Sequence, residues 1–303
     1  MKKKLPVLVL AFNRVDHVTE AMKAIKEYEP ERIYLHSDGP RKNKEGEKEA
    51  VLATQKVMLD AVDWPCEVKT LFREENLGCA NAVYGAISWF FTNEEYGVIV
   101  EDDMVIGVDF FRLCEELLPR YVSENQIMTI QAMNKSHRTD IPNTYVYSWR
   151  GGCWGWASWR RAWAKMDMSM SALPSLSYWK IIKRFGFLPG LYLMRNYWQG
   201  YKHLDTFSSW AYRWSLSIQV NDGLSIVPGV NLAKNIGTDG GAHYDENDID
   251  PFKNLQIGHI EWPLVYNDSL NIDIKQSFYD VKSFYRLKKI SLKKRIRKLF
   301  YKR

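Results

Sequence analysis

The stretch Tyr96-Gly97-Val98-Ile99-Val100-Glu101-Asp102-Asp103-Met104 decides the fold class of this 303-residue chain. Its centre is an apolar run of β-branched residues, which is the pattern of a buried strand in a parallel sheet. Three carboxylates follow at once, where such a strand would end. Open α/β sheets bind ligands outside the carboxyl ends of their strands, and one or two carboxylates plus substrate phosphates hold a hard divalent cation there. The stretch therefore predicts a cation site, and the alternative is a strand that ends in solvated acids.

The first hundred residues alternate between strand-like and helix-like segments. Buried strands are predicted at 5–12, 32–37, 66–72 and 98–100, with helices at 16–28, 42–62 and 76–91. This alternation is typical of right-handed βαβ units, whose parallel strands end at one edge of a sheet. We expect an α/β fold with a mainly parallel, doubly wound, Rossmann-like sheet and further strands at 128–132 and 144–147.

The charge of the chain is divided unevenly along its length. Eleven of the 42 Lys and Arg residues follow Asp280 without an acid, which leaves 31 basic against 36 acidic groups in residues 1–280. A mildly acidic body without zinc-finger spacing, an RNP-like strand or a basic groove argues against nucleic acid as a partner. Four widely spaced cysteines predict reduced thiols. The apolar stretch 5–12 is too short for a spanning helix and lacks a small-residue cleavage site, which argues against a signal peptide. These features predict a cytoplasmic protein.

The C-terminal residues have the pattern of a basic amphipathic helix. Leu292, Ile296, Leu299 and Phe300 fall on one helical stripe, and seven Lys and Arg side chains flank it. Such a helix binds anionic lipid reversibly, with about 1 kcal/mol gained per nearby cation. We predict a peripheral position on the inner face of the cell membrane. A solvated basic tail and a helix packed on a partner are the alternatives.

Polar residues also follow the other strands predicted for the N-terminal half. Arg14 comes after the first strand, and its permanent charge suits a pyrophosphate, although a surface ion pair would also explain it. Asp38 follows the second strand, where it would accept a hydrogen bond from a base or ribose, or begin a turn. Asn76 and Gly78 follow the third, and a glycine at a helix entrance lets backbone amides approach an anion. Together these residues predict a polar ligand site at one sheet edge.

Glycine and tryptophan are interleaved in residues 151–159, Gly-Gly-Cys-Trp-Gly-Trp-Ala-Ser-Trp, which include Trp154. Aromatic residues this dense are often simply core. Beside flexible glycines they also suit stacking against a sugar ring or a nucleotide base. The sequence leaves both interpretations open. Residues 173–204 are predicted to form a helical, inserted or acceptor-side segment.

Five motifs give the chain a resemblance to a known family. They occur in the family's order, cover roughly residues 5–245, and read PVLVLAFNR, YGVIVEDDMVIGVDFF, GGCWGWASW, SSWAYRW and GLSIVPGVNLAKNIGTDGGAHY. They resemble motifs of nucleotide-sugar glycosyltransferases of the GT-A fold, particularly the N-acetylglucosaminyltransferase I type and similar bacterial enzymes. The resemblance implies that Arg14 and Asp38 hold the nucleotide and that Glu101 and Asp102 lie at the sugar diphosphate.

The same resemblance implies a metal site. Asp103 would be the direct ligand of Mn²⁺ (or Mg²⁺). His243 matches a position where many GT-A enzymes place a further metal or diphosphate contact, although a loop histidine among polar residues would look the same. Asn76, Gly78 and Trp154 complete the expected nucleotide-sugar site.

The chain departs from the family where the general base is expected. In the resembled enzymes an acid flanks the tryptophan of the SSWAYRW segment, whereas here Ser209 and Ala211 flank Trp210. Neither can deprotonate a sugar hydroxyl efficiently near neutral pH. Asp205 is the nearest upstream carboxylate and is our prediction for the base. Asp239 is the next candidate, and solvated loop acids would explain both.

These features and the resemblance predict a metal-dependent glycosyltransferase (a hexosyl- or N-acetylhexosaminyltransferase) in surface polysaccharide biosynthesis, and the resemblance alone implies that it inverts the anomeric centre. It would move a sugar from a nucleotide-diphosphate sugar to a glycan or lipid-linked acceptor. The expected domains are a catalytic body at 1–265, with a donor half at 1–110 and an acceptor half at 111–265, and a basic tail at 266–303. The alternatives are a nucleotidyltransferase and a non-catalytic nucleotide- or glycan-binding module.

Overall fold

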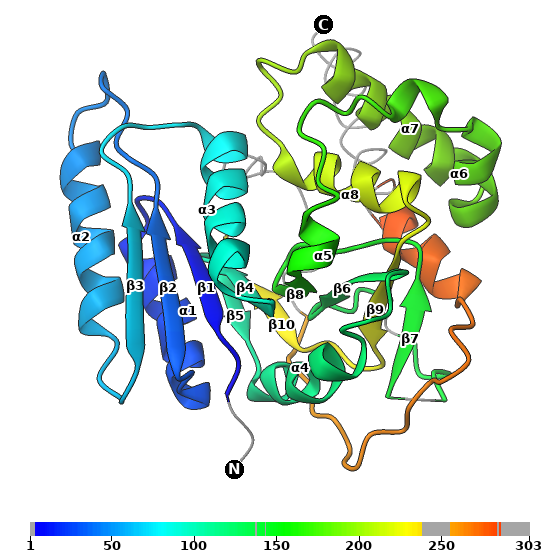
Figure 1. The fold of residues 1–303 in the computed structure, drawn as a ribbon, viewed down its shortest axis with the longest axis horizontal. Helices are drawn as coiled ribbons and strands as arrows, with labels where there is room; N and C mark the ends of the chain where they lie inside the picture. Colours follow the sequence, from blue (N-terminus) through cyan, green and yellow to red (C-terminus); the bar gives the residue numbers. More distant parts are fainter. Residues whose placement is uncertain (1–3, 137, 143, 238–254, 284, 286–303) are drawn as a thin grey trace, which may run out of the picture.

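The computed structural model describes residues 4–136, 138–142, 144–237, 255–283 and 285 (Figure 1). In its N-terminal part strands and helices alternate as predicted. The elements are β1 (Val7–Ala11), α1 (Val15–Tyr28), β2 (Arg32–Ser37), α2 (Glu47–Asp60), β3 (Glu67–Phe72), α3 (Cys79–Asn93), β4 (Tyr96–Glu101), β5 (Met104–Ile106) and α4 (Val108–Arg120).

The rest of the chain adds five strands and a group of helices. They are β6 (Ile127–Gln131), β7 (Tyr145–Ser148), β8 (Trp156–Trp159), α5 (Arg160–Trp163), the 3₁₀ turn η1 (Leu173–Ser175), α6 (Tyr178–Phe185), α7 (Phe187–Lys202), α8 (Trp210–Val220), β9 (Leu224–Pro228) and β10 (Ala233–Asn235). The segment predicted to be helical, 173–204, contains η1, α6 and α7, whose apolar side chains form a second, smaller core. Among the described residues no helix is long and apolar enough to cross a membrane.

Eight strands form one mixed, mainly parallel sheet, which confirms the predicted α/β class. Their order is β3-β2-β1-β4-β8-β6-β9-β7, and β5 pairs with β10 in a separate two-stranded sheet. Strands β3, β2, β1 and β4 are parallel, as are β6 and β9, whereas β8 and β7 run antiparallel to their neighbours. Helix α1 packs against α2 and α4, and α3 packs against α5 and α8 (Figure 1).

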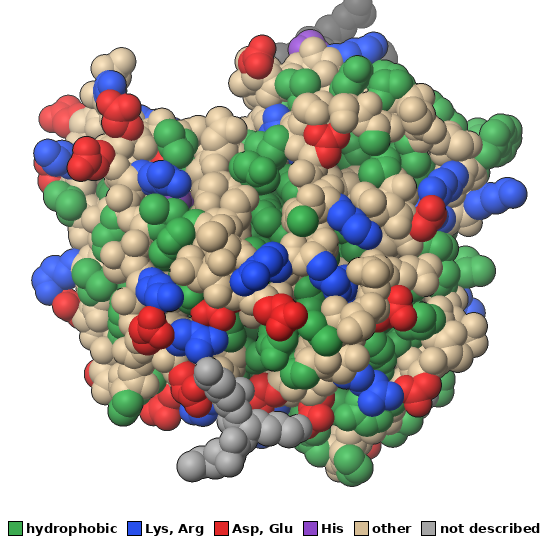
Figure 2. Space-filling model, viewed as in Figure 1, with side chains coloured by type: hydrophobic (Ala, Val, Ile, Leu, Met, Phe, Trp, Pro, Cys, Tyr) green, Lys and Arg blue, Asp and Glu red, His purple; other side chains and the backbone are tan. Residues whose placement is uncertain are grey.

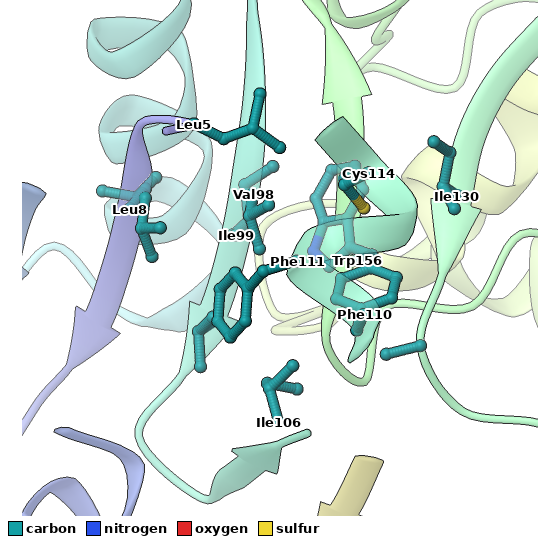
Figure 3. Packing of buried hydrophobic residues seen from close by; sticks show 14 of the residues in the cluster. Leu5, Leu8, Val98, Ile99, Ile106, Phe110, Phe111, Cys114, Ile130 and Trp156 are labelled. Carbon is teal, nitrogen blue, oxygen red and sulfur yellow. The ribbon is translucent and has the colours of Figure 1, made fainter. Parts of the chain in front are cut away.

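The central strands form the core because their side chains are apolar on both sides, as expected of parallel strands covered by helices. Strand β1 is buried throughout, and Val98 and Ile99 of β4 have no exposed surface. Figure 3 shows these two residues beside Phe111 of α4 and Trp156 of β8, all fully buried. Strand β8 therefore joins the two halves of the sheet through one core.

The tryptophans divide between the two interpretations left open by the sequence. Trp156 lies in the core, with its ring stacked on Trp210 at 5.8 Å and close to the rings of Trp163 and Trp214. Trp154, two residues earlier, is half-buried at the wall of a cavity. The glycine–tryptophan segment thus supplies both core and cavity wall.

The start of the predicted tail packs on the body. Ile272 pairs with Tyr147 of β7, and residues 274–283 form a helix whose Ser277 and Val281 are buried. The Ser277 hydroxyl accepts a hydrogen bond from the Trp149 backbone at 3.0 Å. The amphipathic stripe from Leu292 to Phe300 lies outside the described residues and stays a prediction.

Candidate functional site

The acid triplet lies in the turn between β4 and β5, and neighbouring chain segments hold that turn in place. The Asp102 amide donates to the Leu10 carbonyl at 2.9 Å, which extends the pairing of β4 with β1. The Asp103 carbonyl accepts from the Ile236 amide at 2.8 Å, just beyond β10. The Phe12 amide donates to the Asp102 carboxylate at 3.4 Å. The triplet is therefore fixed between the end of β1 and the strand β10.

Arg14 and Asp103 meet at this edge, as the strand-end positions predicted. The Arg14 Nη1 lies 3.5 Å from the Asp103 Oδ2, and about a quarter to a third of each side chain is exposed. Arg14 directly precedes α1, so its position is set by the turn that follows β1. The pair leaves a permanent cation and a carboxylate side by side within reach of solvent.

Negative charge is in excess around this pair. Burial raises the pKa of Asp102 to about 7, the Asp103 carboxylate adds to that shift, and Arg14 opposes it. Burial together with the neighbouring acids also raises the pKa of Glu101 well above its usual range, and burial raises the pKa of Asp103. Charged carboxylates in such a place gain from a bound cation, because it reduces their repulsion.

The residues present fit a divalent cation held in part by a ligand. Within the described residues no group of three or more His, Cys, Asp and Glu side chains could hold a metal ion by itself. A hard cation prefers carboxylate oxygens, and one or two of them suffice when substrate phosphates complete the shell. Asp103 can supply such an oxygen. His243 and Asp239 lie outside the described residues, so their predicted roles stay predictions.

Asp38, Asn76 and Gly78 come together in a second cluster at the same edge. The Asp38 carboxylate accepts hydrogen bonds from the amides of Leu77 at 2.9 Å and Gly78 at 3.1 Å, and from the Asn76 side chain at 3.0 Å. Gly78 has a φ of +76°, a conformation that favours glycine, and it immediately precedes α3. These contacts give Asp38 the task of holding the loop before α3, and its direct contact with a nucleotide stays a prediction.

The strand register places the two clusters at one edge. Leu10 of β1 pairs with His36 of β2 on one side and with Glu101 of β4 on the other. Asp38 lies two residues beyond His36, and the acid triplet begins at Glu101. The sequence rule that strand ends gather polar residues is therefore confirmed for β1, β2 and β4.

A cavity of about 140 Å³ lies in the second half of the chain, among the end of β6, the loop before β8, and α8. Its wall includes Gln131 at the end of β6, residues 150–154 before β8, and Tyr212 of α8. A Cβ atom at Gly152 would lie 2.4 Å from the Gln131 Oε1, so a larger residue there would require the end of the Gln131 side chain to move. The loop thereby brings Trp154 to the cavity wall, and the Lys135 ammonium lies 3.6 Å from the centre of its ring.

Ile99 of β4 pairs with Trp156 of β8, so the acid triplet after Ile99 and the loop before Trp156 lie at the same end of these two strands. That loop includes Cys153. Burial raises the pKa of its thiol to about 12, and the carboxylates of Glu101 and Asp103 push it in the same direction. Lys135 and Arg150, which also line the cavity, oppose that shift. The charges of the acid triplet and of the cavity cations therefore both affect the pKa of the Cys153 thiol.

Asp205 is a predicted site residue that the structure places away from the cavity. Asp205 lies in an exposed turn between α7 and α8, and it is not among the described residues that line the cavity. Sequence analysis missed Lys135, Arg150 and Asp280, which do line it. The strand-end rule applied to β6 would have found Lys135. Nothing in the sequence marked Asp280, because it stood in a segment interpreted as tail.

No family model matches the chain, and no curated protein matches it. Among solved structures it is similar to an inositol-1-phosphate CTP transferase from T. maritima (13% identity, TM-score 0.37, 75% of this chain and 85% of that one). It is also similar to a UDP-glucose pyrophosphorylase complexed with UDP-glucose (9% identity, TM-score 0.37, 74% of this chain and 90% of that one). A third similar structure is the glycosyltransferase GlyE of Streptococcus pneumoniae TIGR4 (12% identity, TM-score 0.30, 58% of this chain and 41% of that one). The fold assignment rests on the strand order given above.

Proposed function

We propose that the protein is a metal-dependent glycosyltransferase that uses a nucleotide-diphosphate sugar. The observation that supports this most strongly is the Arg14–Asp103 pair inside an acid-rich turn at the carboxyl edge of parallel strands. A diphosphate needs cations, and the site offers one permanent cation together with carboxylates suited to Mn²⁺ or Mg²⁺. The donor would be a hexosyl or N-acetylhexosaminyl nucleotide.

Each residue at the edge has a task in this proposal. Arg14 binds the diphosphate, and Asp103 holds the cation, with His243 as the further predicted ligand. The bound cation would neutralise the charge that develops on the leaving diphosphate. Glu101 and Asp102 keep the turn acidic beside the sugar, and the Asp38–Asn76–Gly78 loop faces the nucleotide. Trp154 offers its ring to a sugar.

A nucleotidyltransferase would also bring carboxylates, metal and nucleotide together on an α/β sheet. Enzymes of that class usually carry a glycine-rich basic loop after the first strand. Here β1 is followed by Phe12-Asn13-Arg14, without a glycine. This difference favours sugar transfer, with a glycan or lipid-linked acceptor in surface polysaccharide biosynthesis.

A thermal-shift screen of nucleotide sugars with Mn²⁺ tests the proposal. A ligand at free concentration c that binds only the native state stabilises it by RT ln(1 + c/Kd), which is about 2.7 kcal/mol at 100 times its Kd, and so raises the melting temperature. We expect one nucleotide sugar to raise the melting temperature with Mn²⁺ and to lose that effect with EDTA. Equal shifts from all nucleotides, or none from any, would argue against a nucleotide-sugar site.

The proposed second partner is the anionic inner face of the cell membrane. Apolar side chains stand exposed on α6 and at the start of α7, including Trp179 at 68% and Phe187 at 58%. Figure 2 shows apolar side chains at the upper right, over these helices, with basic side chains beside them. Ile274 and Lys275 of the C-terminal helix border the same surface, and the basic residues 286–303 follow that helix. Aromatic and basic side chains together suit a lipid surface.

Deleting residues 286–303 should release the protein from anionic vesicles. The deletion removes all but one of the basic residues after Asp280 and spares the buried Val281. Because the attraction is electrostatic, high salt should weaken binding of the full chain in the same way, the Debye length being about 8 Å at physiological ionic strength. Co-sedimentation measures both effects. If the full chain and the deletion variant pellet equally with the vesicles, residues 286–303 do not bind the membrane.

A further inference from the structure

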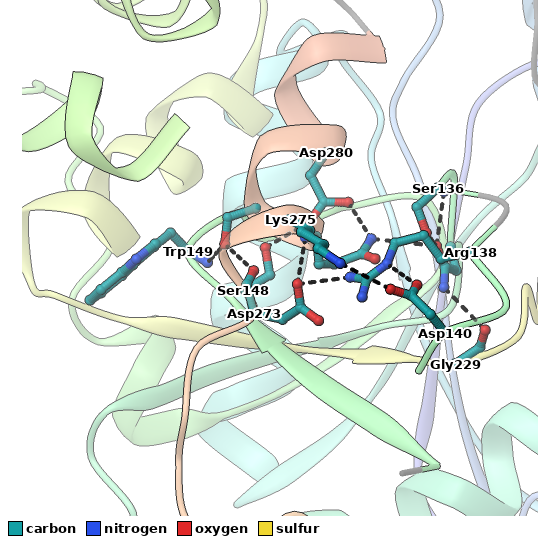
Figure 4. Close-up of polar contacts among 12 residues, drawn as sticks. Ser136, Arg138, Asp140, Ser148, Trp149, Gly229, Asp273, Lys275 and Asp280 are labelled. Atoms are coloured by element: carbon teal, nitrogen blue, oxygen red, sulfur yellow. Dashed lines mark hydrogen bonds and ion pairs between the residues drawn. The ribbon is translucent and has the colours of Figure 1, made fainter. Parts of the chain in front are cut away.

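Asp280 is a buried carboxylate at the wall of the cavity in the second half of the chain. Its side chain is 5% exposed and comes from the helix at 274–283, which packs on β7. The Ser148 hydroxyl donates to its Oδ2 at 2.7 Å, and the Gln276 side chain donates to its Oδ1 at 2.9 Å. Figure 4 shows Asp280 above Ser148 within this network. A carboxylate accepts about four hydrogen bonds, so these two leave it able to accept another.

The surroundings of Asp280 combine charge with a ring-sized space. Lys135, after β6, and Arg150, after β7, are the charged side chains on the same cavity wall, and Cys153 and Tyr212 are its other titratable groups. A cavity of about 150 Å³ holds benzene, so this one can take the ring of a sugar whose hydroxyl groups extend beyond it. The aromatic ring of Trp154 and the polar groups opposite suit a sugar, which has an apolar face and hydroxyl edges.

We propose that this cavity holds the acceptor sugar and that Asp280 accepts the proton of the attacking hydroxyl. The inference rests on the proposed function, since it needs a donor at the acid triplet. Ile99 of β4 pairs with Trp156 of β8, so the acid triplet that follows Ile99 and the cavity loop that precedes Trp156 lie at the same end of these two strands. The acceptor would then lie between Asp280 and the donor's anomeric carbon.

The bonds of this step balance. The acceptor oxygen forms a bond to the anomeric carbon, and the bond from that carbon to the diphosphate oxygen breaks. The nucleoside diphosphate leaves with the electron pair, and the hydroxyl proton moves to the Asp280 carboxylate and from there to solvent. Arg14 binds the departing diphosphate, and Ser148 and Gln276 hold the carboxylate in position.

The pKa of Asp280 supports this role, and the burial of Asp280 at the cavity wall distinguishes it from Asp205. Burial raises the pKa of Asp280 to about 6, against the hydrogen bonds from Ser148 and Gln276 and the charges of Lys135 and Arg150. A general base works best when its pKa lies near the working pH. Asp205 is exposed to solvent in its turn and lies outside the cavity wall.

The test compares Asp280→Asn with the parent protein and with Asp63→Asn, a change at an exposed acid in the loop between α2 and β3. Transfer is measured from the nucleotide sugar found by thermal shift to a panel of p-nitrophenyl hexosides, and donor affinity is measured by calorimetry with Mn²⁺. Asp280→Asn should lower kcat about 10²–10⁴-fold and leave donor affinity within twofold. Asp63→Asn should leave both near the parent values. Turnover of Asp280→Asn within threefold of the parent would overturn the proposal.

A second variant, Ser148→Ala, tests whether Asp280 accepts a proton or has only a structural role. Parent kcat/KM should fall on the acidic side as Asp280, with a pKa of about 6, becomes protonated and can accept no proton. Asp102 of the donor site, with a pKa of about 7, contributes to the same acidic limb. Ser148→Ala removes a hydrogen bond that lowers the Asp280 pKa, so the acidic limb should move to higher pH. An unmoved limb in Ser148→Ala would contradict the assignment. A parent protein that binds no nucleotide sugar would instead overturn the proposed function, and the Asp280 assignment with it.

Discussion

Asp103→Ala is expected to lower the Mn²⁺-dependent affinity for a nucleoside diphosphate by at least about 100-fold. The variant removes the carboxylate that faces Arg14 and leaves the diphosphate without its protein-held cation. The fold should persist, because a half-buried acid with a raised pKa adds little to the stability of the native state. Calorimetric titration of UDP and GDP, with Mn²⁺ and with EDTA, measures the change.

Asp63→Ala is the matched control for this prediction. Asp63 is an exposed acid whose partner is Lys26, and it lies in the surface loop between α2 and β3. Its removal should leave nucleotide affinity and the effect of Mn²⁺ unchanged. If Asp103→Ala binds UDP or GDP with Mn²⁺ as tightly as the parent protein does, the metal assignment to Asp103 is wrong.

Trp156→Ala is expected to lower the free energy of unfolding by about 3–5 kcal/mol. The indole is fully buried in the strand that joins the two halves of the sheet, and it contacts three other tryptophan rings. Its removal leaves a cavity that rigid neighbours cannot fill. Urea denaturation followed by fluorescence and circular dichroism gives the change in unfolding free energy.

Trp179→Ala serves as the control, since that side chain is 68% exposed. It should change the unfolding free energy by no more than about 0.5 kcal/mol. A loss below 1 kcal/mol for Trp156→Ala would mean that the tryptophan cluster is not the support of the central sheet.

The N-terminal half was predictable because its physics is local. Short apolar runs such as 98–100 are typical of buried strands, and the segments between them have apolar residues at helical spacing. The observed β2 has the predicted limits, Arg32–Ser37, and β1 and β4 differ by one or two residues at their ends. The meeting of Arg14 with Asp103 followed from the same rule, since parallel strands end at one edge.

The second half was less predictable because its pairings are not local. Strand β8 follows a glycine–tryptophan turn and inserts antiparallel between β4 and β6, and no turn signal in the sequence sets that order. Nothing in the composition of residues 266–283 separates a packed segment from a tail, because burial there depends on the surface of β7. Asp280 was missed for that reason, and Asp205 was chosen by nearness in sequence.

The products formed from a nucleotide sugar test the central claim most directly. The full chain is incubated with the donor identified by thermal shift, Mn²⁺ and the hexoside panel, and phosphorus NMR follows the phosphates with and without added pyrophosphate. The account predicts a nucleoside diphosphate and a new glycoside in equal amounts, whether or not pyrophosphate is present. Formation of sugar 1-phosphate and a nucleoside triphosphate upon addition of pyrophosphate would show nucleotidyl transfer and contradict it, and so would donor binding without any turnover.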